Sequence, residues 1–278
     1  MAASPYLAHD GLVRVYPAAS GSPTALLVWV HGGAFEWGDL DMPEADWVAR
    51  RFARSGVAVI SVDYRRASNE ISFPLPSDDV VSAFHWVVSN AELLGGDSAR
   101  VLLGGASAGG NLVAGTVIRL LAEGGPLPAG VFLAYPTLHA HQPPPSDELA
   151  SALRSTPPES RWTADDIAVM YQRFIAGPLA DAPSAAVPGT ARPEELVGFP
   201  PTLMVNDEHD DLRASGEGFA RSLIAAGAAL ELHTAPGTTH GHLNSPQLPQ
   251  AEATIRLALE WATRTTTRLT APDRQAHA

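Results

Sequence analysis

Short apolar runs alternate with longer amphipathic stretches along most of the chain, and this alternation restricts the folds that are open to it. The apolar runs, predicted as strands, lie at 25–30, 57–62, 101–103, 130–135, 202–205 and 229–233. The amphipathic stretches, predicted as helices, lie at 42–55, 77–94, 108–123, 215–226 and 246–265. Apolar runs without polar alternation are typical of strands that are covered on both faces. The pattern predicts an α/β fold in which right-handed crossovers build a doubly wound, mostly parallel sheet.

The segment 139–200 interrupts this rhythm between two predicted strands. It is rich in Pro, Ala and Ser, and it contains one predicted helix at 163–176 with Thr163 as the N-cap. An insertion of this kind is typical of a lid over an active site, whereas a surface excursion without a role is the alternative. We predict one domain over 1–278, with 139–200 as a lid or cap insertion and a disordered tail at 269–278.

The composition excludes several kinds of chemistry. All 18 basic residues are Arg and the chain has neither Lys nor Cys, which excludes Schiff bases, a Ser–Lys dyad, disulfides and a Cys nucleophile. Covalent catalysis is left mainly to Ser, Thr, Asp or Glu, with ten His to activate them. The formal net charge of -12 disfavours nucleic acid and anionic membranes as partners. We find no signal peptide and no apolar run long enough to cross a bilayer, so we expect a cytoplasmic protein.

The pentapeptide Gly-Ala-Ser-Ala-Gly at 105–109 follows a predicted strand and opens a predicted helix. A sharp strand–turn–helix of this kind exposes its serine, here Ser107, next to backbone N–H groups and the positive end of a helix. This context favours Ser107 as a nucleophile. A tightly packed corner between strand and helix is the alternative.

A second glycine-rich turn, His31-Gly32-Gly33-Ala34, follows the predicted strand at 25–30. The backbone N–H groups of Gly32 and Gly33, together with that of Ala108, would form an oxyanion hole. An ordinary glycine turn is the alternative. We interpret His31 as a residue that orients this loop.

The catalytic acid and base should follow the serine in the order Asp or Glu, then His. Asp207, Asp210 and Asp211 lie after the predicted strand 202–205, while His240 and His242 lie after the next strand. Both loops come at carboxyl ends of strands, where the sites of open α/β sheets collect. Spacing alone leaves both roles open among these candidates.

Three stretches together resemble the bacterial hormone-sensitive-lipase-like esterases of the α/β-hydrolase fold. Residues 31–39 are similar to that family's oxyanion motif, 62–74 to its second signature stretch, and 104–112 to its nucleophile motif. The resemblance implies that Asp210 is the acid and His240 the base of a triad with Ser107.

The chain also departs from the family pattern. Ala34 replaces a glycine, Ala106 replaces the usual acidic residue before the serine, and His242 replaces a Phe. Ala106 offers no carboxylate to support the oxyanion loop. Because the part before the first long strand forms only a short N-terminal cap segment, the resemblance implies a lid built mainly from 139–200 and a more open acyl pocket.

These features predict a serine carboxylesterase that hydrolyses small, short-acyl esters without a metal or other cofactor. The same triad could act on amides, formamides, carbamates or lactones; a non-catalytic receptor for small molecules is less favoured because His240 is present. Large side chains that could wall the pocket, or instead pack the lid onto the core, are Trp37, Trp162, Met170, Tyr171 and Phe174. By analogy with the fold, edge strands could pair two copies into a homodimer.

Overall fold

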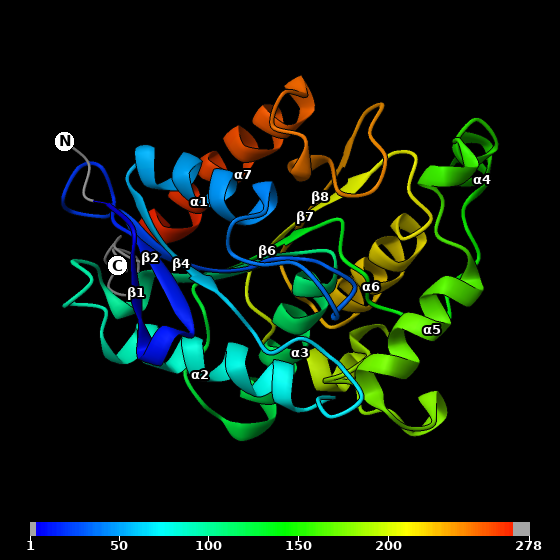
Figure 1. Ribbon diagram of the computed structural model, residues 1–278, viewed down its shortest axis with the longest axis horizontal. Coiled ribbons are helices and arrows are strands. Elements are labelled where there is room, and N and C mark those ends of the chain that lie inside the picture. Colours follow the sequence, from blue (N-terminus) through cyan, green and yellow to red (C-terminus); the bar gives the residue numbers. More distant parts are fainter. Residues whose placement is uncertain (1–3, 269–278) are drawn as a thin grey trace, which may run out of the picture.

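A computed structural model describes residues 4–268 of the chain, whose eight strands form one sheet (Figure 1). The strands are β1 Tyr6–Ala8, β2 Val13–Tyr16, β3 Ala25–Val30, β4 Val57–Val62, β5 Val101–Ala106, β6 Gly130–Ala134, β7 Thr202–Asp207 and β8 Leu230–Ala235. Their order in the sheet is β1-β2-β4-β3-β5-β6-β7-β8. The pairs from β4 through β3, β5, β6 and β7 to β8 are all parallel, whereas β1 pairs antiparallel with β2, and β2 antiparallel with β4. The predicted mostly parallel sheet is confirmed.

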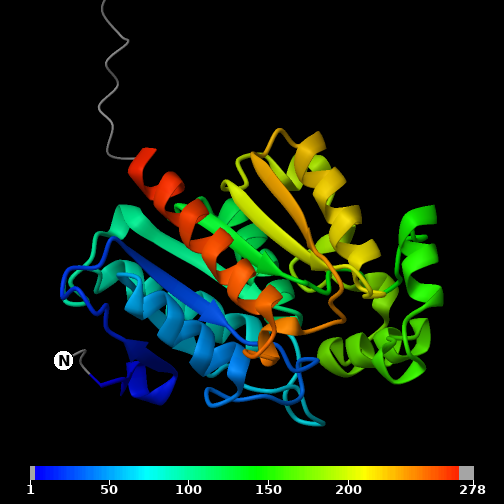
Figure 2. The same ribbon diagram turned by 90° about the horizontal axis from the view of Figure 1, so that it is seen from above.

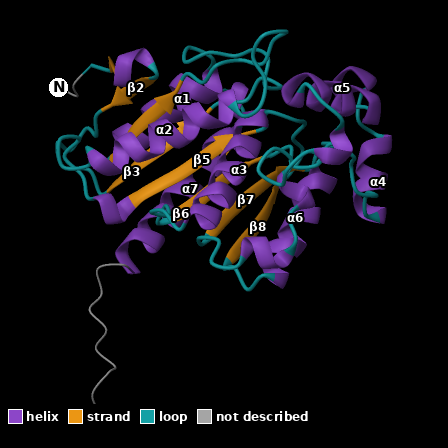
Figure 3. Cartoon of the chain, turned by 90° about the horizontal axis from the view of Figure 1, so that it is seen from below, coloured by secondary structure: helices purple, strands orange, loops and turns teal. Residues whose placement is uncertain are grey.

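Helices cover both faces of this sheet (Figures 1 and 3). They are α1 Pro43–Arg54, α2 Leu75–Ser89, α3 Ala108–Glu123, α4 Asp147–Arg154, α5 Ala164–Ile175, α6 Arg213–Ala225 and α7 Pro249–Arg268. Side chains of α2, α3 and α6 share one apolar core with the sheet, and those of α1 and α7 share the other. The sheet is therefore doubly wound, as the alternation of strands and helices predicts.

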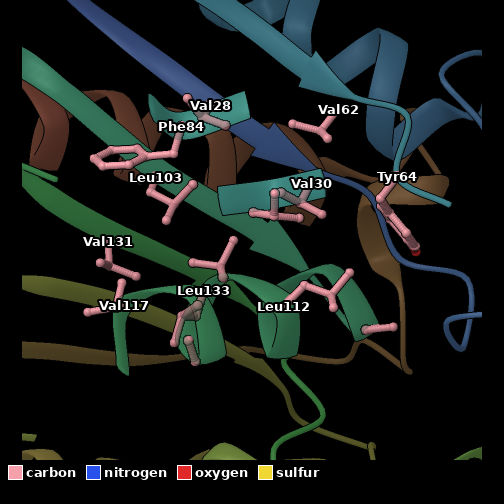
Figure 4. Close-up of a cluster of buried hydrophobic side chains, with 14 of the residues drawn as sticks. Val28, Val30, Val62, Tyr64, Phe84, Leu103, Leu112, Val117, Val131 and Leu133 are labelled. Carbon is pink, nitrogen blue, oxygen red and sulfur yellow. The ribbon is translucent and has the colours of Figure 1, made fainter. Parts of the chain in front are cut away.

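The central strands are buried on both faces, which explains their continuous apolar sequences. On one face Val28, Leu103 and Val131 pack with Phe84 of α2 and Val117 of α3, all of them fully or almost fully buried (Figure 4). On the other face Trp29 of β3 stacks on Phe132 of β6, with ring centroids 5.5 Å apart. The two cores together hold β5 rigidly, and β5 ends at the residue before Ser107.

In the described part of the segment expected as a short N-terminal cap, residues 4–24, no residue lines the cavity at Ser107. Instead β1 and β2 form an antiparallel hairpin that extends the sheet beyond β4. Figure 2 shows this hairpin at the end of the molecule opposite α4 and α5. These strands escape prediction because they are short, and their pairing with β4 is not visible in the local sequence.

The segment 139–200 folds into α4, α5 and several short 3₁₀ turns at one end of the sheet (Figure 2). The predicted helix forms as α5, and its N-cap is confirmed: Thr163 accepts a hydrogen bond from the N–H of Asp166, whose side chain bonds back to Thr163. A second helix, α4, was not predicted; Ser146 caps it by accepting from the N–H of Leu149. The predicted disordered tail at 269–278 lies outside the described residues.

Candidate active site

Ser107 lies at the turn between β5 and α3 in a strained conformation, with φ 52° and ψ -119°. A non-glycine residue rarely adopts positive φ, and such strain is concentrated at functional sites. The flanking glycines permit the turn, because a Cβ at Gly105 would lie 2.5 Å from the carbonyl oxygen of Gly109. A Cβ at Gly109 would lie 2.2 Å from the carbonyl oxygen of Val30. The strand-to-helix elbow that the pentapeptide predicts is therefore present.

The structure brings Ser107, His240 and Asp210 into one hydrogen-bonded line. The Ser107 Oγ lies 2.9 Å from His240 Nε2, and His240 Nδ1 lies 2.7 Å from Asp210 Oδ2. Asp210 is held in turn by the N–H of Leu212, which donates to its Oδ1 at 3.0 Å. With the proton on Nδ1, the bare Nε2 accepts the serine hydroxyl proton, as a general base must.

Burial and mutual charge set the protonation of this line. Burial raises the pKa of Asp210, against the opposing charge and hydrogen bond of His240. Burial alone would lower the pKa of His240, but the charge of Asp210 and its hydrogen bond raise that pKa above the ordinary value of 6.5. Asp207 and Glu44 act on His240 in the same direction. The imidazolium that forms when His240 takes a proton is therefore stabilised by its surroundings.

The three aspartates that the sequence leaves as candidates occupy different places. Only Asp210 contacts His240. Asp207 accepts hydrogen bonds from Thr238 Oγ1 and from the N–H of Gly241 at 2.7 and 2.9 Å, so it holds the loop that carries His240. His242, which replaces a Phe, is buried with its Nδ1 against Asp207 and its Nε2 2.8 Å from Thr254 Oγ1. The departure at His242 is thus accommodated by polar partners.

Asp211 faces away from the triad, toward the lid. Its two carboxylate oxygens accept from Arg161 Nη2 and Nε, both at 2.7 Å, and Oδ2 also accepts from the N–H of Trp162 at 3.0 Å. The Trp162 ring meets His240 edge-on, with centroids 5.7 Å apart. Asp211 therefore anchors residues 161 and 162 of the segment 139–200 beside His240.

The oxyanion loop corrects one prediction. The N–H of Gly32 donates to Glu44 Oε1 at 2.5 Å, so it is not free to bind an oxyanion. The N–H groups of Gly33 and Ala34 have no acceptor in the described part of the chain, and both residues line the cavity in front of Ser107. Ala108 begins α3, where an N–H has no partner within the helix. The donors that the geometry supports are therefore Gly33, Ala34 and Ala108.

Sequence reasoning missed Ala34 because the loop conformation decides which amides face the cavity. Ala34 has φ 50°, in the region that favours glycine. Glu44 was missed as well, because no motif marks it, although it is almost fully buried beside the loop.

A cavity of about 760 Å³ opens in front of Ser107 and His240. Trp37, Trp162 and Met170 line it, in agreement with the prediction. Tyr171 and Phe174 do not. The Tyr171 hydroxyl donates to the carbonyl of Thr137 and accepts from Asn111 Nδ2, and the Phe174 ring stacks on Phe35 with centroids 4.0 Å apart. Both side chains pack the lid onto the core instead.

Asp207, Asp210 and His240 also place ligand atoms within 4.8 Å of one another. These atoms already serve the hydrogen bonds described above, so the cluster is better explained as part of a triad. In the described part of the chain, no helix has both the length and the apolar composition that a membrane span requires.

Comparison with known proteins identifies the family. A family model described as the alpha/beta hydrolase fold matches residues 27–244. The chain belongs to the α/β-hydrolase family. Within it, carboxylesterase NlhH of Mycobacterium tuberculosis is 38% identical over 248 residues, which cover 85% of this chain and 73% of that protein.

Two further relatives of this α/β-hydrolase support the predicted branch of the family. Hormone-sensitive lipase of Mus musculus is 33% identical over 124 residues, 45% of this chain and 16% of that protein. The solved structure of EstE1, a thermophilic carboxylesterase cloned from a metagenomic library, matches with a TM-score of 0.79 at 28% identity, covering 95% of this chain and 88% of that one. The resemblance to hormone-sensitive-lipase-like esterases is confirmed.

Proposed function

We propose that the protein is a serine carboxylesterase that hydrolyses small, short-acyl esters through Ser107, His240 and Asp210. The observation that carries this proposal is the line of two hydrogen bonds, 2.9 and 2.7 Å long, that ends on a strained serine in a cavity. The names of relatives such as carboxylesterase NlhH support the same bond type.

The first half of the reaction transfers the acyl group to the enzyme. His240 Nε2 takes the hydroxyl proton as Ser107 Oγ attacks the ester carbonyl, and Asp210 stabilises the imidazolium. The negative charge that forms on the carbonyl oxygen faces the N–H groups of Gly33, Ala34 and Ala108, and one such donor typically contributes about 3 kcal/mol. His240 then gives its proton to the departing alcohol, and the acyl-enzyme remains.

The second half returns the serine. Water loses a proton to His240 as its oxygen attacks the acyl carbonyl, and the carboxylic acid leaves when Ser107 Oγ regains the proton. Each proton thus moves through the same Nε2 in both halves. No step requires a metal or other cofactor.

The cavity wall favours short acyl groups. Its apolar part, Trp37, Trp162 and Met170, is interrupted by the carboxylates of Asp165 and Asp166 on the lid. A long alkyl chain would have to lie against these charged groups, whose desolvation is costly. A short acyl group can stay on the apolar part.

The decisive experiment replaces the nucleophile. The variant Ser107→Ala should fold normally and lose both hydrolysis of p-nitrophenyl acetate and labelling by a fluorophosphonate probe. Ser55→Ala, an exposed serine at the end of α1, is the matched control and should retain both. Turnover in Ser107→Ala near the wild-type rate would reject the triad.

Matched amides, formamides and lactones, tested with the same protein, separate an esterase from the other reactions that this triad can perform. A wild-type protein that is not labelled by the fluorophosphonate probe would favour the alternative of a non-catalytic receptor for small molecules. The homodimer and the cytoplasmic location stay predictions.

A further inference from the structure

Glu44 is a buried carboxylate at the floor of the active-site cavity. It comes from the first turn of α1, is only 1% exposed and lines the cavity in front of Ser107. No Arg or His in the described part of the chain forms an ion pair with it. Because a buried unpaired charge is costly, the hydrogen bonds that it receives must be strong and its position must matter.

Three donors satisfy the carboxylate, and each comes from a different part of the site. Oε1 accepts from the N–H of Gly32 at 2.5 Å, in the oxyanion loop. Oε2 accepts from the Tyr135 hydroxyl at 2.7 Å, directly after β6, and from Asn244 Nδ2 at 3.0 Å, in the loop after His240. Glu44 thus joins the oxyanion loop to the histidine loop.

The contact with Gly32 controls the direction of the oxyanion amides. The peptide nitrogen of Gly32 is held by Glu44, and its carbonyl oxygen lies 2.6 Å from His31 Nδ1 and accepts from the Tyr64 hydroxyl at 3.0 Å. With both of its backbone polar groups held, Gly32 fixes the direction in which the chain enters Gly33, a residue that lines the cavity. Space is tight on both sides, because a Cβ at Gly32 would lie 2.6 Å from Glu44 Oε1 and 3.0 Å from the Cβ of Ser107.

The contacts of Glu44 with Tyr135 and Asn244 link it to the surroundings of His240. The Tyr135 ring meets His240 edge-on, with centroids 5.3 Å apart, and Asn244 lies in the 3₁₀ turn that begins two residues after His240. Asn244 Oδ1 also accepts from the N–H of Glu44 at 3.3 Å, so the two residues bond reciprocally. Ala106, next to the nucleophile, has no side-chain acceptor that could replace these bonds.

We propose that the Glu44 carboxylate is a positioning group for ester hydrolysis, which holds the oxyanion loop and the histidine loop in register around Ser107. This assignment rests on the proposed esterase function. It predicts two separable effects when the carboxylate is changed: misdirected oxyanion amides lower kcat, and loss of the negative charge alters the titration of His240.

The electrostatic effect has a defined sign. The charged groups that act on His240 are Asp210, Asp207 and Glu44, and all three raise its pKa, while the Tyr135 and Trp162 rings pack against it. Removal of the Glu44 charge should therefore move the acid limb of kcat/KM to lower pH, because His240 stays neutral further into the acid range.

The experiment compares Glu44→Gln, Glu44→Ala and Asp46→Asn in the full-length protein with p-nitrophenyl acetate. Gln keeps one acceptor for Gly32 but no charge, so kcat should fall about 10-fold with KM nearly unchanged and the acid limb should move down. Ala removes every acceptor, and kcat should fall about 100-fold. Asp46 is the matched control, since it is an acid on the same helix that pairs with Arg50 and Tyr16 outside the cavity. Asp46→Asn should keep the wild-type kcat and pH profile.

The outcomes separate this assignment from the proposed function. An active wild-type protein whose Glu44→Gln variant keeps both kcat and the acid limb refutes the role of Glu44 alone. A fall in kcat with an unmoved acid limb also refutes it, because packing without charge would give that result. A wild-type protein that neither hydrolyses the ester nor takes a fluorophosphonate label refutes the esterase function as well. If Glu44→Ala does not fold, Glu44→Gln decides the question.

Discussion

Replacement of Asp211 with Asn should release the part of the lid that lies over the cavity. In the wild-type protein, Asp211 accepts two hydrogen bonds from the Arg161 guanidinium, both at 2.7 Å, and one from the N–H of Trp162 at 3.0 Å. Asn offers a single oxygen and no charge. It can keep only one of the two bonds from Arg161, without the charge, so the bidentate pairing is lost.

The size of the effect follows from these contacts. A hydrogen bond to a charged group contributes about 1.5–3 kcal/mol when it is well buried. The Arg161 side chain is 34% exposed and Asp211 13%, so solvent screens part of the interaction. A net loss of about 2 kcal/mol for docking of this segment is a reasonable order of magnitude. This loss corresponds to a population of molecules with the segment around Arg161 undocked that is about 30-fold larger in Asp211→Asn than in the wild type.

Limited proteolysis with trypsin measures this population directly. The chain has no Lys, so trypsin can cut only after Arg, and the bond between Arg161 and Trp162 is sequestered while Asp211 holds both residues. Cleavage of a transiently opened segment tracks the open population when opening is fast. Mass spectrometry of the fragments should show cleavage after Arg161 that is about 30-fold faster in Asp211→Asn than in the wild type.

Glu148→Gln is the matched control, because Glu148 of α4 in the same segment forms an ion pair with Arg213 of α6, two residues after Asp211. It binds Arg213 at 3.1 Å, but its side chain is 75% exposed, so its removal should change cleavage after Arg161 less than 2-fold. Equal cleavage in Asp211→Asn and the wild type would show that Asp211 does not hold the lid. Equal acceleration in both variants would show that any loss of charge loosens it.

Replacement of Tyr171 with Phe should lower the free energy of unfolding by about 2 kcal/mol, measured by urea denaturation, because Asn111 Nδ2 and the Thr137 carbonyl lose a buried partner; an unchanged midpoint would contradict the docking role of this hydroxyl. Activity should fall with decreasing pH as His240 becomes protonated, and the midpoint of that limb in kcat/KM should lie above pH 6.5, because Asp210 raises the pKa of His240 despite burial. A midpoint below pH 6.5 would mean that desolvation outweighs the charge of Asp210.

The sequence predicts the centre of the fold well, because burial on both faces leaves a clear local signal. The apolar runs 25–30 and 57–62 coincide with β3 and β4, and the helix predicted at 108–123 coincides with α3. Helix ends are less well predicted: α2 ends at Ser89, and 90–95 continues in turns that an amphipathic pattern does not distinguish from helix.

In the candidate site, too, the residues marked by a local sequence signal could be predicted, and those placed by the tertiary structure could not. Ser107 could be predicted, because its strained turn requires small neighbours at fixed positions in the sequence. The choice of Asp210 over Asp207 and Asp211 could not be made from spacing, since it depends on which loop each carboxylate faces after β7 and β8 are paired. Resemblance supplied that choice, and in the structure Asp210 is the one of the three that lies within hydrogen-bond distance of His240.

The misassigned oxyanion donor shows why backbone roles are harder to predict than side-chain roles. A glycine count marks Gly32 and Gly33 as equivalent, but a peptide N–H has a direction that the sequence does not contain. That direction is set here by Glu44, which lies in α1, twelve residues after Gly32, and belongs to no sequence motif. A single buried acceptor therefore shifts the donor pair by one residue, to Gly33 and Ala34.

In the proposed mechanism, the adjacency of Asp210 and Asp211 would couple substrate access to the base. One carboxylate orients His240, and the next holds Arg161 and Trp162, whose ring lies edge-on against the same histidine. If the segment that carries Trp162 opened, His240 would lose an apolar neighbour and gain water, so its interaction with Asp210 would weaken in the higher dielectric. We therefore expect Asp210 to support His240 most strongly while residues 161 and 162 are docked on Asp211.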